Sequence, residues 1–241
     1  MLILAIESAT ERVGCALGDG ETVRAVFEIT GERRHAETLV PAIDALCRAA
    51  GVTFDDVGCI AADVGPGLFT GLRVGLATAR ALAHALDVPV VGLSSLELLA
   101  HPLRLAGRMV ASVIDARRGE VYWQLFRPEG DHLHSLGPAR CAPPDELLGE
   151  LRITDEAMVL VGDGARRYRD RLADLSDAVW ADAELAHPSA SSLVVLAQVA
   201  RLAGAGGEAA DLEPMYLRAP DAQINWATRA LSASDGAGAG R

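Results

Sequence analysis

The chain has 241 residues, of which 50% are hydrophobic and 4% aromatic, so its cores must consist mainly of Ala, Val and Leu. A formal net charge of −11 argues against a chain that holds a phosphate backbone by itself. No apolar run reaches the roughly 18–20 residues that span a bilayer. The apolar start ends at Glu7 and has no basic leader, unlike a signal peptide. The four cysteines are scattered and form no CxxC pair. We therefore expect a cytoplasmic protein with reduced thiols, no zinc site and no membrane partner.

Strand-like runs and two helices make up the first half of the chain. A hairpin turn is expected at Asp19-Gly20. Helices are expected over about 35–50, with Leu39 and Ile43 on the apolar face, and from the glycine-rich turn after residue 64 to about residue 86. Strands are expected over 2–6, 13–17, 22–29, 57–64 and 88–93.

The second half repeats this order. The expected strands are 109–114, 121–126, 132–141, 158–161 and 178–180, and the expected helices are 144–151, 165–175 and 189–203, with an extended piece at 213–217. Each half therefore gives β-β-β-α-β-α-β, with a mixed sheet, which is the plan of the actin-like ATPases and sugar kinases. The alternative is one mixed sheet without duplication.

This repeat predicts an α/β protein with two tandem lobes. We place the N-terminal lobe at residues 1–100 and the C-terminal lobe at 101–220. The remaining residues, 221–241, are too small and polar to pack, and we expect them to form a disordered tail.

Four polar residues stand where the two-lobed kinases contact a nucleotide. Glu7 follows the first strand of the first half, Asp115 follows its counterpart in the second half, and Ser8 and Thr10 carry hydroxyls that reach toward a phosphate. The second loop, 115–119, has a single glycine, and its bulky side chains block the approach of backbone amides to a ligand. We therefore favour turn residues that satisfy local amides over catalysis, and leave a weak nucleotide contact open.

Metal and nucleophile motifs are incomplete. His35 is followed one turn later by Leu39, where a helical metal site requires a second ligand, and the sequence contains no GxSxG motif. The basic run Arg166–Arg171 is interleaved with Asp170, which favours a solvated face over an RNA contact. We predict no metal ligand and no catalytic residue in this chain.

A stripe of small residues is the most informative local pattern. Gly67, Gly71, Gly75, Ala79 and Ala83 recur every fourth residue and so follow one side of the expected helix. An interior glycine costs about 1 kcal/mol of helix stability relative to alanine, so a close approach of another element must offset it. Phosphate binding beside Thr70 is the alternative, but it requires glycines only in the first turn. The spacing does not say whether the stripe packs inside the lobe or against another chain.

Five segments resemble the TsaB (YeaZ) family, whose members act in the synthesis of N6-threonylcarbamoyladenosine in tRNA. The segments follow the family's order along the chain: ILAIES (3–8), HAETLVP (35–41), GPGLFTGLRVG (65–75), DARRGEVYW (115–123) and EPMYLR (213–218). The resemblance implies an actin-like two-lobed fold and a non-catalytic partner of the transferase TsaD. The rival is a stand-alone enzyme, either an ATPase or kinase using Glu7 and Asp115 or a metallopeptidase.

The resemblance also implies partners. Family members pair with TsaD and with themselves through the N-terminal lobe helices, the ATPase TsaE joins them, and tRNA is contacted only through the complex. ATP or ADP is then expected at the TsaD interface, with no cofactor of the chain's own. The interface residues expected on this basis are Gly67, Thr70, Gly71, Arg73, Gly75, Ala79, Ala83, Leu39 and Ile43.

Overall fold

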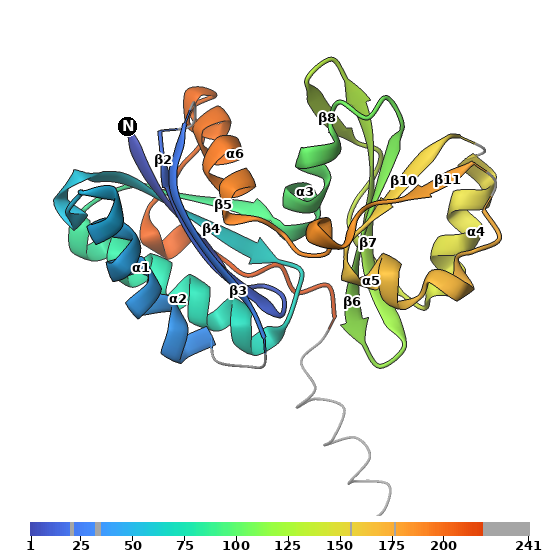
Figure 1. Cartoon of the computed structure of the whole chain (residues 1–241), viewed down its shortest axis with the longest axis horizontal. Helices are drawn as coiled ribbons and strands as arrows, with labels where there is room; N and C mark the ends of the chain where they lie inside the picture. Colours follow the sequence, from blue (N-terminus) through green and yellow to red (C-terminus); the bar gives the residue numbers. More distant parts are fainter. Residues whose placement is uncertain (20–21, 32–34, 155, 176, 219–241) are drawn as a thin grey trace, which may run out of the picture.

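Two α/β lobes lie side by side in the computed structural model (Figure 1). The structure describes residues 1–19, 22–31, 35–154, 156–175 and 177–218. Within those ranges no helix is both long and apolar enough to cross a membrane. The predicted tail 221–241 and Gly20 of the predicted hairpin turn lie outside the described residues.

The first lobe contains a five-stranded mixed sheet in the order β3-β2-β1-β4-β5. Its central strand β1 pairs antiparallel with β2 and parallel with β4, and it is apolar up to its last residue, Glu7, because both of its faces are covered. Leu4 and Ile6 point to one face, whereas Ile3 and Ala5 point to the other. The strands are β1 (Leu2–Glu7), β2 (Arg12–Gly18), β3 (Val23–Thr30), β4 (Val57–Gly65) and β5 (Val90–Ser94).

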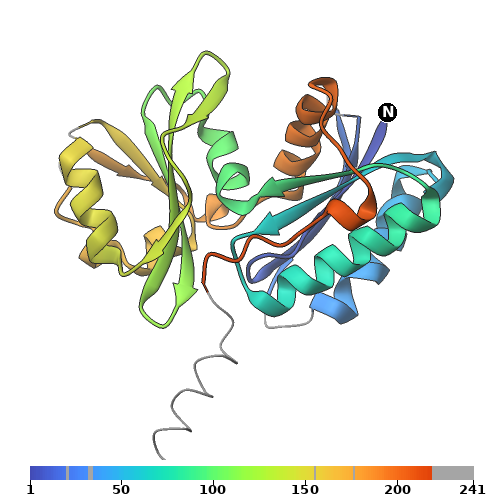
Figure 2. The same ribbon diagram turned by 180° about the vertical axis from the view of Figure 1, so that it is seen from behind.

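Helices cover both faces of this first sheet (Figures 1 and 2). On one face, α1 (His35–Ala50) and α2 (Phe69–Leu86) pack side by side and contribute Leu39, Ile43 and Ala79 to the core around Leu4 and Ile6. On the other face lies α6 (Ala190–Leu202), which comes from the far end of the chain. The first lobe is therefore a three-layer α/β/α unit.

The second lobe repeats the same sheet topology. Its strand order from one edge is β8-β7-β6-β10-β11, which matches β3-β2-β1-β4-β5 strand for strand. The duplication predicted from the sequence is confirmed, the single-sheet alternative is excluded, and the fold is the two-lobed actin-like ATPase fold. The elements are β6 (Met109–Arg117), β7 (Glu120–Glu129), β8 (His132–Ser135), β9 (Arg140–Ala142), α4 (Pro144–Thr154), β10 (Met158–Val161), α5 (Asp163–Arg167) and β11 (Ala178–Trp180).

Two predicted elements of the second lobe are wrong in detail. The strand expected over 132–141 is interrupted at Gly137 and Pro138, and β8 and β9 both pair with β7 on either side of the break. Proline has no N–H to donate to a sheet, which explains the interruption. The helix expected over 165–175 is only α5 followed by a 3-10 turn, because Tyr168 leaves helical dihedrals (φ −104°, ψ 23°).

The predicted lobe boundaries also differ from the packing. Although α6 lies within the predicted second lobe, its Leu193 and Val194 pack against Ile3 of the first sheet. Conversely, α3 (Ser95–Ala100) lies in the predicted first lobe, yet its Leu96 packs against Val110 of the second sheet. Helical periodicity identifies a buried face but not the sheet that buries it, so the sequence placed both helices by chain order.

A C-terminal strap, residues 207–218, joins the two lobes (Figure 2). Gly207 bridges to Val90 at the edge of the first sheet, and Leu212 is buried in the first lobe's core. Its far end reaches the second lobe, where Arg218 donates hydrogen bonds to Glu120 (2.8 Å) and to the carbonyl of Ala116. The strap covers the predicted extended piece 213–217, which forms no strand.

The stripe of small residues faces the chain's own sheet. A Cβ atom added to Gly67 would lie 2.1 Å from the Ala9 carbonyl oxygen, and one added to Gly75 would lie 2.2 Å from the Ser8 hydroxyl. The Ser8 hydroxyl itself donates to the Gly71 carbonyl at 2.9 Å. The stripe therefore packs inside the lobe, where it lets α2 approach the loop after β1 closely.

Gly67→Ala tests this close approach. Because the new methyl group would meet backbone rather than a flexible side chain, we expect the free energy of unfolding to fall by about 1–3 kcal/mol. The control is Gly149→Ala in α4, where an added Cβ meets nothing within 4 Å. That substitution should stabilise the protein by about 0.5–1 kcal/mol through helix propensity. Urea denaturation measures both, and equal effects would contradict the packing role of Gly67.

Candidate functional site

The residues predicted to contact a nucleotide lie near the ends of β1 and β6 and on the loop that leaves β1. Glu7 and Asp115 retain 0% and 4% of their surface, and Ser8 and Thr10 are buried as well. Each side chain lies at the edge of its sheet where parallel strands end, which is the usual place for ligand crevices in open α/β sheets. The sequence thus located the right edge, but these groups are closed off from solvent.

Glu7 is held by its own loop and by a second carboxyl group. Its Oε1 accepts a hydrogen bond from the backbone N–H of Ala9 at 2.8 Å. Burial, and after it the neighbouring Asp63 carboxylate, raises the pKa of Glu7 well above its usual value. Asp63, at the end of β4, was not among the predicted site residues.

Asp115 is saturated by groups of the second lobe. It accepts hydrogen bonds from the Arg117 backbone N–H (2.9 Å), the Arg117 guanidinium (3.0 Å) and the Tyr168 hydroxyl (3.3 Å). Arg167 forms an ion pair with it at 3.5 Å. Its backbone N–H donates to Asp163, and burial raises the pKa of Asp163 to about 6. Asp115 therefore organises its own loop, as the turn hypothesis predicted.

Side chains from both lobes meet in the region where the two lobes of a kinase separate to admit substrate. Glu11 of the first lobe pairs with Arg117 of the second at 2.5 Å. Arg12 donates to the carbonyl of Glu184 at 3.3 Å. His187 lies beside these groups, and burial together with Arg12 lowers its pKa to about 4. The imidazole is thus neutral at physiological pH, and the contacts of Glu11 and Arg12 link the two lobes at this point.

These residues do not fit a nucleotide held between the lobes. A ligand cannot touch Glu7, Ser8, Thr10 or Asp115 without displacing protein that already covers them. The loop 162–164 offers no phosphate cradle either, because a Cβ atom on Gly162 would lie 2.1 Å from the Val113 carbonyl oxygen. Its glycines allow backbone to pack on backbone.

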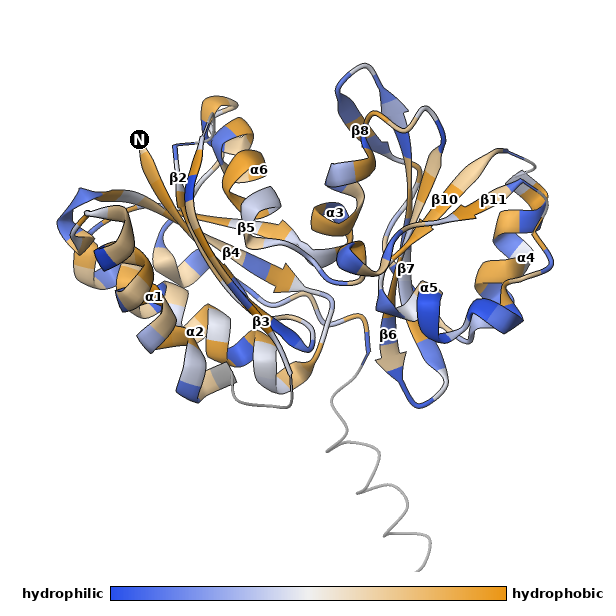
Figure 3. Cartoon of the chain, in the orientation of Figure 1, coloured by the Kyte–Doolittle hydropathy of each residue, from blue (hydrophilic) through white to orange (hydrophobic). Residues whose placement is uncertain are grey.

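The other sites considered from the sequence are a metal site and the basic run Arg166–Arg171. No group of three or more His, Cys, Asp or Glu side chains that could hold a metal ion occurs within the part of the chain that the structure describes. In the basic run, Arg167 pairs with Asp115, Arg169 lies over the Trp180 ring at 5.0 Å, and Arg171 bonds to Asp145 at 3.2 Å. The run begins in α5, which is largely hydrophilic (Figure 3), and continues in the 3-10 turn Arg169–Arg171.

The predicted partner interface needs correction. Thr70 and Arg73 are exposed and Gly67 is half-buried. The remaining predicted residues are buried in the first lobe and present no side chain to a partner: Gly71, Gly75, Ala79, Ala83, Leu39 and Ile43. The stripe belongs to the side of α2 that faces its own sheet.

A second stripe on α2 faces solvent. Phe69, Arg73, Ala77 and Ala81 also recur every fourth residue, and all four are exposed. They are offset by two positions from the small-residue stripe, roughly 200° around the helix. We define the outer helical face as the exposed residues Ala36, Val40, Phe69, Thr70, Arg73, Ala77 and Ala81 of α1 and α2.

One end of the outer helical face carries an aromatic and cationic cluster. The Arg73 guanidinium lies 3.8 Å from the centroid of the Phe69 ring and donates to the Tyr216 hydroxyl at 3.2 Å. The Phe69 and Tyr216 rings are 5.5 Å apart. Sequence reasoning missed Phe69 and Tyr216, although the second four-residue repeat was a signal for the former.

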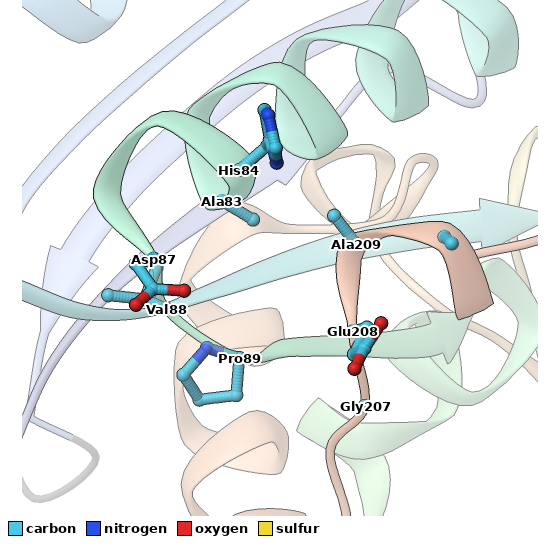
Figure 4. Close-up of a pocket in the computed structure, with 9 residues that line it drawn as sticks. Ala83, His84, Asp87, Val88, Pro89, Gly207, Glu208 and Ala209 are labelled. Atoms are coloured by element: carbon cyan, nitrogen blue, oxygen red, sulfur yellow. The ribbon is translucent and has the colours of Figure 1, made fainter.

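Two hollows on the surface lie away from Glu7 and Asp115. One of about 510 Å³ is lined by His84, Asp87 and Glu208 at the carboxyl end of α2 (Figure 4). Another, of about 430 Å³, lies where the C-terminal strap passes β5. Neither of these two hollows is lined by Glu7 or Asp115.

The family model described as "TsaD: tRNA N6-adenosine threonylcarbamoyltransferase" matches residues 28–226. The "tRNA threonylcarbamoyladenosine biosynthesis protein TsaB" of Escherichia coli (strain K12) is 32% identical over 221 residues, which cover 90% of this chain and 95% of that protein. The chain belongs to the TsaB family. The TsaB of Bacillus subtilis (strain 168) is 29% identical over 228 residues, covering 94% and 98% of the two chains. "YeaZ from Pseudomonas aeruginosa" superposes with a TM-score of 0.79 at 32% identity, covering 90% and 99%.

A binding experiment checks the closed region of this TsaB-family chain. We expect the isolated protein to bind MgATP no more tightly than a Kd of about 1 mM, which corresponds to about 4 kcal/mol. Calorimetric titration of the wild type and of Asp115→Asn should give the same result for both. Saturable binding that weakens in Asp115→Asn, accompanied by ATP turnover, would establish the kinase-like rival instead.

Proposed function

We propose that this chain is an accessory subunit in the formation of N6-threonylcarbamoyladenosine in tRNA, and that its partner is the transferase TsaD. The observation that carries the proposal is full-length similarity to proteins named for this biosynthesis, including 32% identity to the Escherichia coli TsaB. The match of a TsaD family model over residues 28–226 fits a chain that shares the architecture of its catalytic partner.

A non-catalytic role agrees with the chemistry of the interlobe region. An ATPase or transferase needs accessible groups that contact the phosphates and the metal ion. Here Glu7 and Asp115 are buried, and Asp115 is neutralised by Arg117 and Arg167. The pairing of Glu11 with Arg117 also opposes the separation of the lobes that substrate entry would require. These contacts favour a scaffold over either enzyme hypothesis.

The outer helical face is the surface that we assign to TsaD. Val40 is 59% exposed and Phe69 is 42% exposed, which is more apolar surface than a helix turned toward water usually presents. Ala77 and Ala81 permit another helix to come to the short end of the usual 8–10 Å separation. Phe69 is held in place by Arg73 and Tyr216, so little side-chain freedom is lost on docking.

The remaining partner assignments follow from the same role. TsaE joins the TsaD complex, the same helices form a homodimer when TsaD is absent, and tRNA is contacted through the complex. ATP or ADP binds at the TsaD interface rather than between the lobes of this chain. The assembly acts in the cytoplasm.

Val40→Arg tests the docking surface. A buried, unpaired guanidinium at a helix contact should weaken TsaD binding at least about tenfold, or 1.4 kcal/mol. The matched control is Val179→Arg on β11, since Val179 is 46% exposed and lies in the other lobe. Titration calorimetry with purified TsaD measures both variants. Equal affinities, with both proteins folded by circular dichroism, would show that the outer helical face is not the contact.

Reconstitution tests the function itself. TsaD, TsaE, tRNA and the precursor system should form the modified nucleoside only when this chain is present, and Val40→Arg should reduce the yield in parallel with binding. Nucleoside analysis by mass spectrometry measures the product. Full yield without this chain would overturn the accessory role, whereas turnover by this chain without TsaD would support a stand-alone enzyme.

A further inference from the structure

Two carboxyl groups lie side by side in the core of the first lobe. In the parallel pairing of β1 with β4, Ile6 is opposite Ala62, so Glu7 and Asp63 follow at the same level of the sheet. Side chains at matching positions of parallel neighbours point to the same face. Glu7 and Asp63 keep 0% and 3% of their surface, so bulk solvent does not screen them from each other.

Each carboxyl group uses one oxygen and leaves the other without a partner. Glu7 Oε1 accepts from the Ala9 N–H, and Asp63 Oδ1 accepts from the Gly65 N–H (2.7 Å) and the Ser95 hydroxyl (2.6 Å). Glu7 Oε2 and Asp63 Oδ2 are buried and have no hydrogen-bond partner. Two buried acceptors without a donor are costly, and two adjacent carboxylates cannot both stay ionised there.

No cation within the surrounding described residues compensates these charges. Glu7 faces Asp63 from β4, Glu28 from β3 and Arg12 from β2. Arg12 is engaged with Glu28 at 3.3 Å, so its positive charge is already matched. From α3, Asp63 receives only the Ser95 hydroxyl, which is neutral and bonded to Oδ1. A proton is therefore the simplest group that satisfies both free oxygens.

We propose that Glu7 and Asp63 share one proton between Oε2 and Oδ2, and that this hydrogen bond is a pH-sensitive latch for the start of α2. The bond joins the end of β1 to the end of β4, and the two carboxyl groups also accept from Ala9 and Gly65, which lead into the following loop and turn. That loop and turn meet at the N–H of Leu68, which donates to the Ala9 carbonyl at 2.6 Å, and Ser8 of the loop donates through its hydroxyl to Gly71. Loss of the proton leaves two like charges at the strand ends from which the loop and the turn start.

The latch operates near neutral pH. Burial raises the pKa of Asp63 to about 7, and burial with the Asp63 charge raises that of Glu7. In the unfolded chain both groups titrate near 4. Because the folded values are the higher ones, the pair's contribution to stability is complete below about pH 4 and is lost as the pH rises toward 7 and above.

Glu7→Gln tests whether the pH dependence of stability comes from the shared proton. Glutamine keeps an oxygen for the Ala9 N–H and offers a permanent N–H donor to Asp63 Oδ2, so no proton is required. Between about pH 5.5 and pH 8 the wild type should lose at least about 4 °C in melting temperature more than Glu7→Gln does. The pKa values of Asp163 and Glu97 are also raised by burial, and these two groups contribute the same pH dependence of melting temperature to both proteins.

Hydrogen exchange locates the effect. The intrinsic rate of amide exchange rises with pH. In the wild type, the amides of residues 69–72 should exchange at pH 8 at least about tenfold faster than this intrinsic rise alone accounts for. In Glu7→Gln the same amides should show only the intrinsic rise. Asp44→Asn, a change at an exposed carboxylate of α1, is the control and should behave like the wild type.

Carboxyl carbon NMR of the wild type measures the titration directly, and Asp63→Asn assigns the signal. One resonance of the Glu7–Asp63 pair should titrate near pH 7 and disappear from that range in Asp63→Asn. Titration of both groups below about pH 5, or an unchanged melting slope in Glu7→Gln, would overturn the proposal. Neither readout involves TsaD, so failure of the latch and failure of the proposed function are distinguishable.

Discussion

The structure of the first lobe depends on the close approach of α2 to the loop that leaves β1. Gly67 lies against the backbone of Ala9, Gly75 lies against Ser8, and the Ser8 hydroxyl bonds to Gly71. With side chains at these glycines the helix could not reach this position. The contact fixes the position of α2 on its sheet, and with it the direction in which the opposite side of α2 faces.

The loop after β1 is occupied by α2 on one side, and Glu11 and Arg12 engage the second lobe on the other. Polar residues therefore remain at the edge of the sheet where ligands bind in related architectures, but they hold the protein's own backbone. What the chain presents to its surroundings is instead the outer helical face.

Much of the fold was predictable because strands buried on both faces are continuous apolar runs. The predicted strands 158–161 and 178–180 coincide with β10 and β11, and the repeated order of elements gave the duplicated sheet topology. Which sheet α3 and α6 cover was not predictable, since an apolar stripe does not name its partner. In the site, Glu7 and Asp115 were found from their places after equivalent strands. Asp63 was missed because an acid inside an apolar run has no local partner in sequence, and Ser95 is distant along the chain.

The C-terminal strap has a consequence for synthesis of the chain. The sheet of the first lobe is translated early, but one of its faces waits for Leu193 and Val194 of α6 and its opposite core waits for Leu212. A nascent chain of about 100 residues thus exposes apolar surface that only the last tenth to fifth of the protein can cover. Such long-range closure slows folding and leaves early intermediates prone to association. The N-terminal lobe, though first to emerge from the ribosome, is among the last parts of the molecule to be complete.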